Sequence, residues 1–338
     1  MSKKKEVGIV IPYFGQFPNY FDFWLKSALA NKDFDFLIFT DNKAYQTVNN
    51  VKFINMSFEH FKKLLQNKVN FSICLNEPYK ICDYRPLFGE ALHEYLKSYS
   101  FWGFCDVDLI LGNLSQYITA EILSDYDKIY EKGHLTLLRN VEKCNILWKV
   151  KHHIPDAYRY DEAFKTPYPC HFDEDDGLTK IAKLKKIKTY ACVDFADIDR
   201  SKFNFFMLGK EKKVHPGIFE WNKGQLCYMY KENEAIITQE VVYAHFQKRK
   251  IKILNKNKKL CINKFVIEPN QIVTEYNLNK ILTRQHIVDN YNYYKINRQN
   301  EIIKKIGQHA IQQRIYRLCF KKINRKRLDL HRENINGE

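Results

Sequence analysis

Residues Phe101 to Leu114 read FWGFCDVDLILGNL, an almost wholly apolar stretch with two carboxylates, Asp106 and Asp108, one residue apart. A run this apolar is typical of a strand buried on both faces, as in the parallel sheets of α/β proteins. A carboxylate at the end of such a strand needs a partner or a metal ion, because burying an uncompensated charge is costly. The stretch therefore predicts a buried strand with an Asp-x-Asp site that suits a hard divalent cation, which would also bridge a diphosphate.

The alternative for this pair is a turn or capping role for one aspartate and a surface ion pair for the other. A three-residue motif alone does not decide between the two interpretations. The apolar residues on both sides favour the metal site, since burial without a partner would cost several kcal/mol.

Outward from this stretch, apolar runs typical of strands alternate with helical patterns. We expect strands in EVGIVIPYFG, DFDFLIFTDN and KFINMSF, and helices in YFDFWLKSALANK, FEHFKKLLQNK, GLTKIAKLKKIK and after Pro86. VHPGIFEWNKGQLCYMY indicates a hairpin turned at residues 222–224, and VVYAHFQKRKIKIL indicates a strand with a histidine near its middle. The alternation predicts an α/β fold with a Rossmann-related, mixed but mostly parallel sheet flanked by helices. Ligands of such sheets bind at the carboxyl ends of the strands, where Tyr13, Asp41 and Asp106 fall.

Composition narrows the class of partner. The 338 residues carry 55 Lys and Arg against 39 Asp and Glu, a formal net charge of +16 that favours nucleotides, phospholipid headgroups or nucleic acid. The sequence has neither a secretory signal nor the roughly 20 apolar residues of a membrane-spanning helix. The nine cysteines include no C-x-x-C pair, which is typical of reduced thiols. We therefore expect a cytoplasmic protein, soluble or peripheral to a membrane.

The composition changes after about Glu275 to Asn, Gln, Lys, Arg and Tyr. We therefore divide the chain into a catalytic domain, residues 1–275, and a basic helical extension, residues 276–338. EIIKKIGQHAIQQRIYRLCFKKINRKR has apolar residues at roughly helical intervals among basic ones. Such a helix either lies on an anionic membrane surface or packs its apolar side against the domain.

Three further groups of residues carry possible chemistry. His245 lies in AHFQKRK beside Lys248 and Arg249, and imidazole is a ligand for Mn²⁺ and similar metals, although a lone histidine in a strand is more often structural. In PYKICDYRPLFG, three charged residues precede a helix and would either read a nucleotide or form a solvated ion-pair cluster; they are Lys80, Asp83 and Arg85. In HFDEDDG, Asp173 and Glu174 would act as a general base or simply favour a helix N-terminus.

Seven segments occur in a specific order: IVIPYFGQFPNYFDFWLKS, FLIFTDN, PYKICDYRPLFGEAL, YSFWGFCDVDLILGNL, GHLTLLRN, FDEDDG and AHFQKRK. Together they resemble a bacterial family of polysaccharide-biosynthesis glycosyltransferases with the GT-A fold and an Asp-x-Asp motif. The resemblance covers roughly residues 5 to 255, and the basic C-terminal region lies outside it.

The resemblance implies a role for each motif. Asp106 and Asp108 would bind a divalent metal ion, Mn²⁺ or Mg²⁺, and His245 would join them. The nucleotide would contact Asp106, Lys248 and Arg249 through its phosphates, and its base and ribose would contact Pro12, Tyr13, Thr40, Asp41, Lys80, Asp83 and Arg85. Asp173 or Glu174 would be the catalytic base; Asp175 and Asp176 depart from the family pattern, which leaves the identity of the base open.

The sequence thus predicts a metal-dependent glycosyltransferase that uses a nucleotide-sugar, preferably a UDP-sugar. Its acceptor would be a glycan or a lipid-linked saccharide, in the biosynthesis of capsule, exopolysaccharide or lipopolysaccharide at the inner face of the plasma membrane. A nucleotidyltransferase is one alternative, but IPYFGQFPNY lacks a Gly- and Lys-rich phosphate loop. A nucleic-acid-binding protein is the other; we do not expect nucleic acid as a partner, because the aromatic residues lie mostly within core patterns.

Overall fold

The computed structural model describes residues 5–198, 204–205, 217–247, 249–254 and 263–283, and the single positions 315, 318, 319, 322 and 323. The chain forms two compact units. Unit 1 consists of Met1–Asn55, Cys105–Asp125 and Ala191–Gln299, and unit 2 consists of Met56–Phe104, Tyr126–Tyr190 and Asn300–Glu338.

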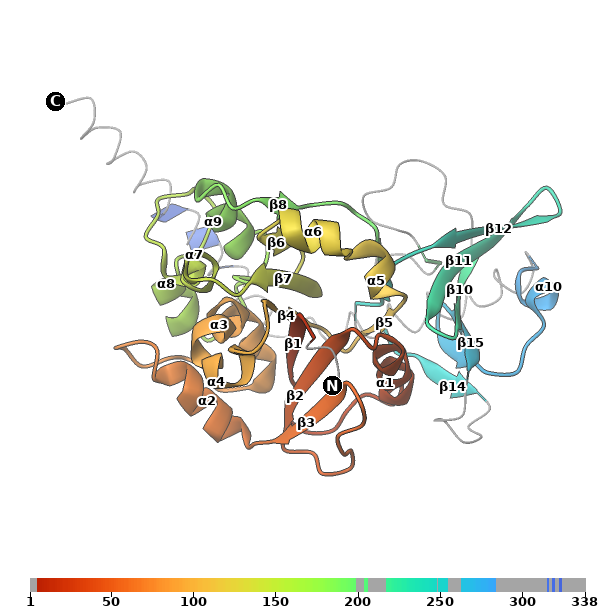
Figure 1. The fold of residues 1–338 in the computed structure, drawn as a ribbon, viewed down its shortest axis with the longest axis horizontal. Helices are drawn as coiled ribbons and strands as arrows, with labels where there is room; N and C mark the ends of the chain where they lie inside the picture. Colours follow the sequence, from red (N-terminus) through yellow and green to blue (C-terminus); the bar gives the residue numbers. More distant parts are fainter. Residues whose placement is uncertain are drawn as a thin grey trace. The chain divides into compact units, whose positions relative to one another are not determined.

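Unit 1 begins with a parallel β-α-β arrangement, as the sequence predicts (Figure 1). Its elements are β1 (Val7–Pro12), α1 (Phe21–Ala30), β2 (Phe34–Thr40) and β3 (Val51–Asn55). The strands lie in the order β3-β2-β1, and every residue of β2 is buried. The one carboxylate in β2, Asp35, is paired with Lys5 at 2.6 Å and with Lys52 at 2.7 Å. An apolar run of this kind forms a central strand because both of its faces are covered.

Two more sheets complete the strands of unit 1. The six-stranded sheet has the order β12-β11-β10-β15-β16-β14, and the three-stranded sheet has the order β5-β13-β9. The remaining elements of unit 1 are β5 (Leu109–Leu111), α5 (Leu114–Tyr117), α6 (Ala120–Asp125), β9 (Ala196–Asp197), β10 (Gly217–Asn222), β11 (Gln225–Glu232), β12 (Ala235–Glu240), β13 (Tyr243–His245), β14 (Lys252–Leu254), β15 (Lys264–Glu268), β16 (Gln271–Val273) and α10 (Leu278–Ile281). The predicted hairpin is confirmed as β10–β11, and its turn residues Lys223 and Gly224 have φ of 49° and 100°, as tight hairpin turns require.

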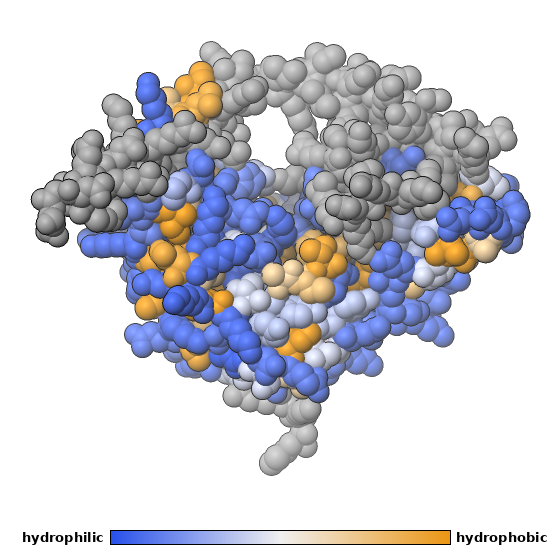
Figure 2. Space-filling model, turned by 90° about the horizontal axis from the view of Figure 1, so that it is seen from above, coloured by the Kyte–Doolittle hydropathy of each residue, from blue (hydrophilic) through white to orange (hydrophobic). Residues whose placement is uncertain are grey.

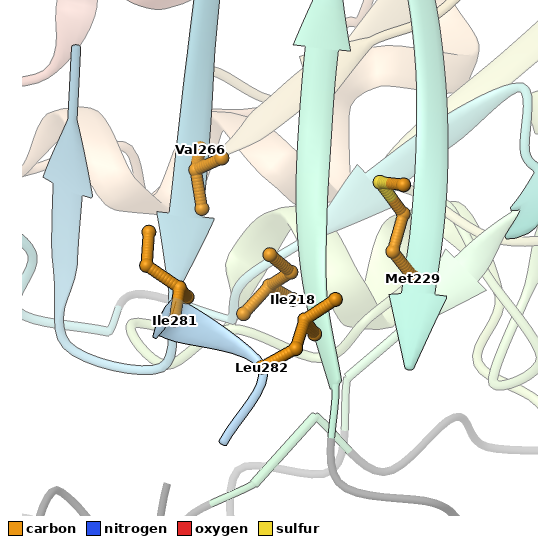
Figure 3. Packing of buried hydrophobic residues seen from close by; sticks show 5 residues of the cluster. All are labelled: Ile218, Met229, Val266, Ile281 and Leu282. Carbon is orange, nitrogen blue, oxygen red and sulfur yellow. The ribbon is translucent and has the colours of Figure 1, made fainter. Parts of the chain in front are cut away.

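The short helix α10 covers part of the six-stranded sheet. Figure 3 shows Ile281 and Leu282 pointing towards Ile218 of β10, Met229 of β11 and Val266 of β15. This small apolar cluster attaches Ile281 and Leu282 to the six-stranded sheet of unit 1. The domain division at residue 275 stays a prediction, because residues 284–314 and most of 315–338 lie outside the described residues.

Unit 2 contains a second α/β arrangement. Its strands lie in the order β4-β7-β6-β8, with β6 parallel to β8 and antiparallel to β7. Its elements are α2 (Phe58–Gln66), the 3-10 helix η1 (Pro78–Leu87), α3 (Phe88–Ala91), α4 (His93–Leu96), β4 (Phe101–Cys105), β6 (Lys128–Ile129), β7 (Leu135–Arg139), α7 (Glu142–Asn145), the 3-10 helix η2 (Leu147–Lys149), α8 (Tyr160–Lys165), α9 (Leu178–Leu184) and β8 (Thr189–Tyr190). The α/β fold class predicted from the sequence is therefore confirmed, with helices beside parallel and antiparallel strands.

The structure corrects two predicted strands. FWGFCDVDLIL is not one strand: β4 ends at Cys105, and β5 begins at Leu109 in a different sheet. VVYAHFQKRKIKIL is also divided, so that His245 ends β13 instead of lying mid-strand. Both breaks fall at charged or polar residues, Asp106 and Asp108 in the first and Gln247 and Arg249 in the second.

Apolar surface is scattered among the described residues. On the face seen in Figure 2, hydrophilic residues cover most of the coloured surface and hydrophobic residues form small separate patches. In the part of the chain that the structure describes, no helix combines the length and apolar character that crossing a membrane requires.

Candidate functional site

The three-stranded sheet of unit 1 brings distant parts of the sequence together. Its central strand β13 is antiparallel to β5, with His245 opposite Leu109, and parallel to β9, with His245 opposite Asp197. The backbone N–H of Phe246 donates to the carbonyl oxygen of Asp108 at 2.9 Å. This register places Asp108, His245 and Asp197 side by side, although they come from three separate segments.

The three side chains that the sequence predicts as metal ligands lie within reach of one ion. The possible ligand atoms of Asp106, Asp108 and His245 are all within 4.8 Å of one another. His245 Nε2 lies 3.4 Å from Asp108 Oδ1 and 4.0 Å from Asp106 Oδ2. Asp108 and His245 are only 8% and 9% exposed. Two carboxylates and one imidazole form a donor set that fits Mn²⁺ or Mg²⁺.

The surrounding carboxylates stabilise the protonated form of His245. Burial by itself would lower the pKa of the imidazole, but hydrogen bonds to Asp108 and Asp197 and the charges of Asp108 and Asp106 raise that pKa to about 10. The ring is therefore positively charged at neutral pH when only protein groups surround it.

The carboxyl ends of β1 and β2 carry the predicted nucleotide-binding residues of unit 1. The parallel register places Pro12 opposite Phe39, so Tyr13 and Thr40 follow at the same edge. The loops after the two strands are joined, since Gly15 N donates to Asp41 Oδ1 at 2.7 Å. Thr40 is buried, Pro12 and Tyr13 are half-buried, and Asp41 is exposed.

Aromatic side chains connect this edge to the aspartates. The ring of Tyr13 stacks on Phe17 with centroids 4.8 Å apart, and Phe17 stacks on Phe21 of α1. Burial and the charge of Asp108 raise the pKa of both Tyr13 and Tyr20. In the same helix, Trp24 Nε1 donates to the carbonyl oxygen of Asp106 at 3.2 Å. The Tyr13 edge and the Asp106–Asp108 pair therefore belong to one neighbourhood within unit 1.

In unit 2, Lys80 and Asp83 form an ion pair whose side chains are both 0% exposed, with Lys80 Nζ 2.5 Å from Asp83 Oδ2. Lys80 also donates to the carbonyl oxygens of Ala163 and Tyr168. Asp83 accepts from the backbone N–H groups of Cys170 at 2.7 Å and Phe172 at 3.0 Å. The pair was predicted to contact a nucleotide, but both heads are enclosed and fixed on protein groups.

The same motif reaches the acidic turn through Arg85. Its Nη1 lies 2.9 Å from Asp173 Oδ2 and donates to the carbonyl oxygen of Gly133 at 2.9 Å. The guanidinium also lies over the ring of Phe104, 5.4 Å from its centroid. Asp173 is 1% exposed, whereas Glu174 is half-buried. Asp83 thus holds the backbone that leads into the acidic turn, and Arg85 holds its first carboxylate.

Of the two basic residues after His245 that were predicted to face the diphosphate, the structure describes Arg249. Lys248 lies outside the described residues. Arg249 is 4% exposed, donates to the carbonyl oxygen of Pro269 at 3.3 Å and lies 5.4 Å from the ring centroid of Phe205. These contacts are those of an interior side chain.

Two residues of the metal neighbourhood escape prediction from the sequence. Asp197 lies in VDFADID, whose Asp-x-Asp triplet at 197–199 is no stronger than any other three-residue match, and its contact with His245 joins residues 48 positions apart. Tyr20 stands in an aromatic-rich segment whose pattern indicates only a helix. Both depend on the pairing of distant segments, which motif spacing does not reveal.

Comparison with known proteins places the chain in a family. Residues 9–276 match the model of a family described as "Family of unknown function (DUF6625)". The chain belongs to this family. We found no match among curated protein sequences.

The chain was also compared with solved protein structures, and two of the matches are glycosyltransferases. The glycosyltransferase GlyE of Streptococcus pneumoniae TIGR4 shares 11% identity over 57% of this chain and 46% of GlyE, with a TM-score of 0.32. The galactosyltransferase LgtC, solved with donor and acceptor sugar analogs, shares 11% identity over 56% of this chain and 75% of LgtC, with a TM-score of 0.31. The match therefore spans less than half of the GlyE chain.

Proposed function

We propose that this protein is a metal-dependent glycosyltransferase of the GT-A type. It transfers a sugar from a nucleotide-sugar, preferably a UDP-sugar, to a glycan or lipid-linked acceptor during the assembly of a bacterial surface polysaccharide. The observation that carries the proposal is the gathering of Asp106, Asp108 and His245 within 4.8 Å beside the carboxyl edge of parallel strands.

The donor would bind along the edge formed by the loops after β1 and β2. Tyr13 offers a half-buried aromatic face already held by Phe17, which suits stacking with a base. The exposed carboxylate of Asp41 suits the hydroxyl groups of a ribose. Asp106 and Asp108 would then meet the diphosphate end of the donor through the metal ion.

Each group in this arrangement has a defined part in the chemistry. A divalent cation bound by Asp106, Asp108 and His245 would supply neutralisation of the negative charge that develops on the departing diphosphate. The three protein ligands fix the site, and the low exposure of Asp108 and His245 strengthens electrostatic interactions there. Tyr13 and Asp41 orient the donor, so that its anomeric carbon is presented in one direction.

We propose Glu174 in the acidic turn as the base that removes the proton from the acceptor hydroxyl. Asp173 is nearly inaccessible and is held by Arg85, whereas the side chain of Glu174 retains contact with solvent. In this assignment Lys80, Asp83 and Arg85 position the turn instead of binding the nucleotide. Asp173 is then a positioning residue for Glu174.

A thermal-shift titration tests this function. UDP, GDP, CDP and dTDP are added with and without Mn²⁺ to the wild type and to Asp108→Ala, since a ligand that binds only the folded state raises its apparent stability. We expect a rise with one nucleotide that requires Mn²⁺ and is lost in Asp108→Ala. Asp33→Ala is the matched control, because Asp33 is an exposed carboxylate of unit 1 that accepts from Ser115 at 2.8 Å. No rise with any nucleotide would reject the glycosyltransferase function.

We further propose that the protein works at the cytoplasmic face of the membrane, held there by the basic C-terminal segment. Ile315, Leu318 and Ile323 occupy helical positions on one side and are 55%, 62% and 51% exposed. Basic residues flank them in RIYRLCFKKINRKR, as in helices that bind anionic bilayers. Co-sedimentation with phosphatidylglycerol vesicles, but not with phosphatidylcholine vesicles, is expected. Replacing all three apolar residues by serine should abolish it.

A further inference from the structure

We propose that Asp197, assisted by Gln247, is a positioning residue that aims the Nε2 atom of His245 at the metal site. The inference rests on the proposed metal-dependent function. It adds a residue outside the Asp-x-Asp motif and outside the segment that carries the histidine.

The strand register fixes where Asp197 lies. β9 and β13 are parallel, with Ala196 opposite Ala244 and Asp197 opposite His245, and the backbone N–H of Ile198 donates to the carbonyl oxygen of His245 at 3.1 Å. Neighbouring residues of adjacent strands project their side chains to the same side of a sheet. Asp197 is therefore held beside the imidazole by the backbone, whatever its side chain contacts.

The two ring nitrogens of His245 face different groups. Nδ1 lies 2.9 Å from Asp197 Oδ1, a normal hydrogen-bond distance. Nε2 lies 3.4 Å from Asp108 and 4.0 Å from Asp106, which are distances that a bound ion could bridge. A hydrogen bond from Nδ1–H to a carboxylate fixes the ring so that the lone pair of Nε2 is available to a metal. The geometry thus assigns Nδ1 to Asp197 and Nε2 to the ion.

Gln247 holds Asp197 from a second direction. Its Nε2 donates to the same Oδ1 of Asp197 at 2.9 Å. Its backbone has φ of +48°, a left-handed conformation that costs a residue other than glycine about 1 kcal/mol or more. The chain adopts this conformation two residues after His245, where it turns the amide of Gln247 back towards Asp197. Two side chains of the segment 245–247 therefore hydrogen-bond to the carboxylate of Asp197.

Isothermal titration calorimetry with Mn²⁺ alone tests the inference, since it measures metal binding without any activity. We expect Asp197→Asn and Asp197→Ala to weaken Mn²⁺ binding by about 10- to 100-fold, the usual effect of losing a group that orients a ligand histidine. Asp194→Asn is the matched control: it removes the same charge three residues earlier, and it should bind Mn²⁺ as the wild type does. Circular dichroism and thermal unfolding establish that each variant is folded.

A second measurement reads the ring directly. In the Mg²⁺-loaded wild type, ¹H–¹⁵N correlation spectra of the histidine side chains should show the proton of His245 on Nδ1, and Asp197→Asn should lose this single form. A purely structural ion pair would leave the metal affinity unchanged. Gln247→Ala, which removes one of the two hydrogen bonds to Asp197, should weaken Mn²⁺ binding several-fold and covers the case in which Asp197→Ala fails to fold.

The outcomes separate the inference from the proposed function. If the wild type does not bind Mn²⁺, the metal-dependent function fails, and this inference fails with it. If the wild type binds Mn²⁺ and the Asp197 and Gln247 variants bind it equally well, only the inference is overturned.

Discussion

The metal cluster of unit 1 and the acidic turn of unit 2 are both built on nearly enclosed aspartates, but their neighbours differ. In unit 2, Asp83 and Asp173 face Lys80 and Arg85, whose side chains are donors to carboxylates and are not the usual ligands of a metal ion. In unit 1, Asp106, Asp108 and Asp197 all face His245, a residue that both changes its charge and binds metals.

The difference separates a structural framework of ion pairs in unit 2 from a site in unit 1 that can bind a metal ion. A lysine or arginine beside a buried carboxylate satisfies it permanently and fixes the local backbone. A histidine among three carboxylates supplies a proton that a divalent cation can replace, and the cation can in turn hold a phosphate. Short acidic motifs in one chain therefore have different roles. The role depends on whether the fold places a lysine, an arginine or a histidine next to the carboxylates.

The largest expected effect comes from breaking the metal cluster. Asp108→Asn keeps the shape of the side chain but removes a charged ligand, so sugar transfer should fall by about 10³-fold or more, or roughly 4 kcal/mol of transition-state stabilisation. The measurement is release of UDP from a UDP-sugar in the presence of Mn²⁺. Asp33→Ala should retain full activity. An active Asp108→Asn would show that this cluster is structural, like its counterpart in unit 2.

Breaking the framework should instead lower the free energy of unfolding. Asp83→Ala leaves the fully buried Lys80 without its carboxylate, and removal of one partner from a buried pair costs about 3–5 kcal/mol. Urea denaturation of the wild type and the variant gives this difference in the free energy of unfolding. The double variant Lys80→Met/Asp83→Leu should recover only part of the loss, because the backbone N–H groups of Cys170 and Phe172 would still lack the carboxylate that accepts from them. A fully stable Asp83→Ala would contradict the framework role.

The fold could be predicted from the sequence wherever the apolar pattern is local. The run VGIVIP, the all-buried FDFLIFT and the hairpin around Lys223 and Gly224 each specify their own element. The two strand breaks could not be predicted. A strand ends before Asp106 and another ends at His245 because of the sheet that each following segment joins, and the local apolar pattern does not show that pairing.

The candidate site could be predicted only in part for the same reason. Asp106, Asp108 and His245 have the residue types of a metal site, and their motifs suggested it. The burial of Lys80 and Asp83 could not be inferred, since a charged cluster before a helix is usually solvated. Asp197 opens a second Asp-x-Asp triplet, but the sequence does not connect this triplet to His245, because only the pairing of β9 with β13 brings the two residues together.

A smaller change should disturb the acidic turn without affecting the metal cluster. A Cβ at Gly133 would lie 2.6 Å from Asp173 Oδ2 and 2.6 Å from Glu174 Oε1. Because both atoms are side-chain ends, Gly133→Ala should displace the carboxylates and cost about 1–3 kcal/mol of stability. Transfer activity should fall about 10- to 100-fold through misplacement of the base.

The Gly133→Ala comparison requires Mn²⁺ titration of the same protein. Its affinity for Mn²⁺ should equal that of the wild type, because the metal ligands lie in unit 1. Unchanged transfer activity would remove Asp173 and Glu174 from the proposed mechanism.

Lys128 provides the sharpest contrast with Lys80, and at neutral pH its replacement should have the smallest effect. Both lysines are 0% exposed, but Lys128 donates to the carbonyl oxygen of Tyr130 at 2.5 Å, where Lys80 has the carboxylate of Asp83. Burial lowers the pKa of Lys128 to about 7, against the opposing charges of Glu131 and Asp175. Between this pKa and the ordinary value of an unfolded lysine, the unfolded chain binds more protons than the folded one. The free energy of unfolding should therefore rise with pH, by up to about 1.4 kcal/mol per pH unit between about pH 7 and pH 10.

Lys128→Met removes the titrating group, so its stability should lack this rise. Urea denaturation of both proteins at several pH values gives the difference, in which the other titrating groups cancel. Lys149→Met, which removes an exposed lysine paired with Glu90 at 2.8 Å, should follow the pH dependence of the wild type. Parallel curves for the wild type and Lys128→Met would mean that water reaches the ammonium group. In that case burial would not distinguish Lys128 from an exposed lysine, and the contrast with Lys80 would be lost.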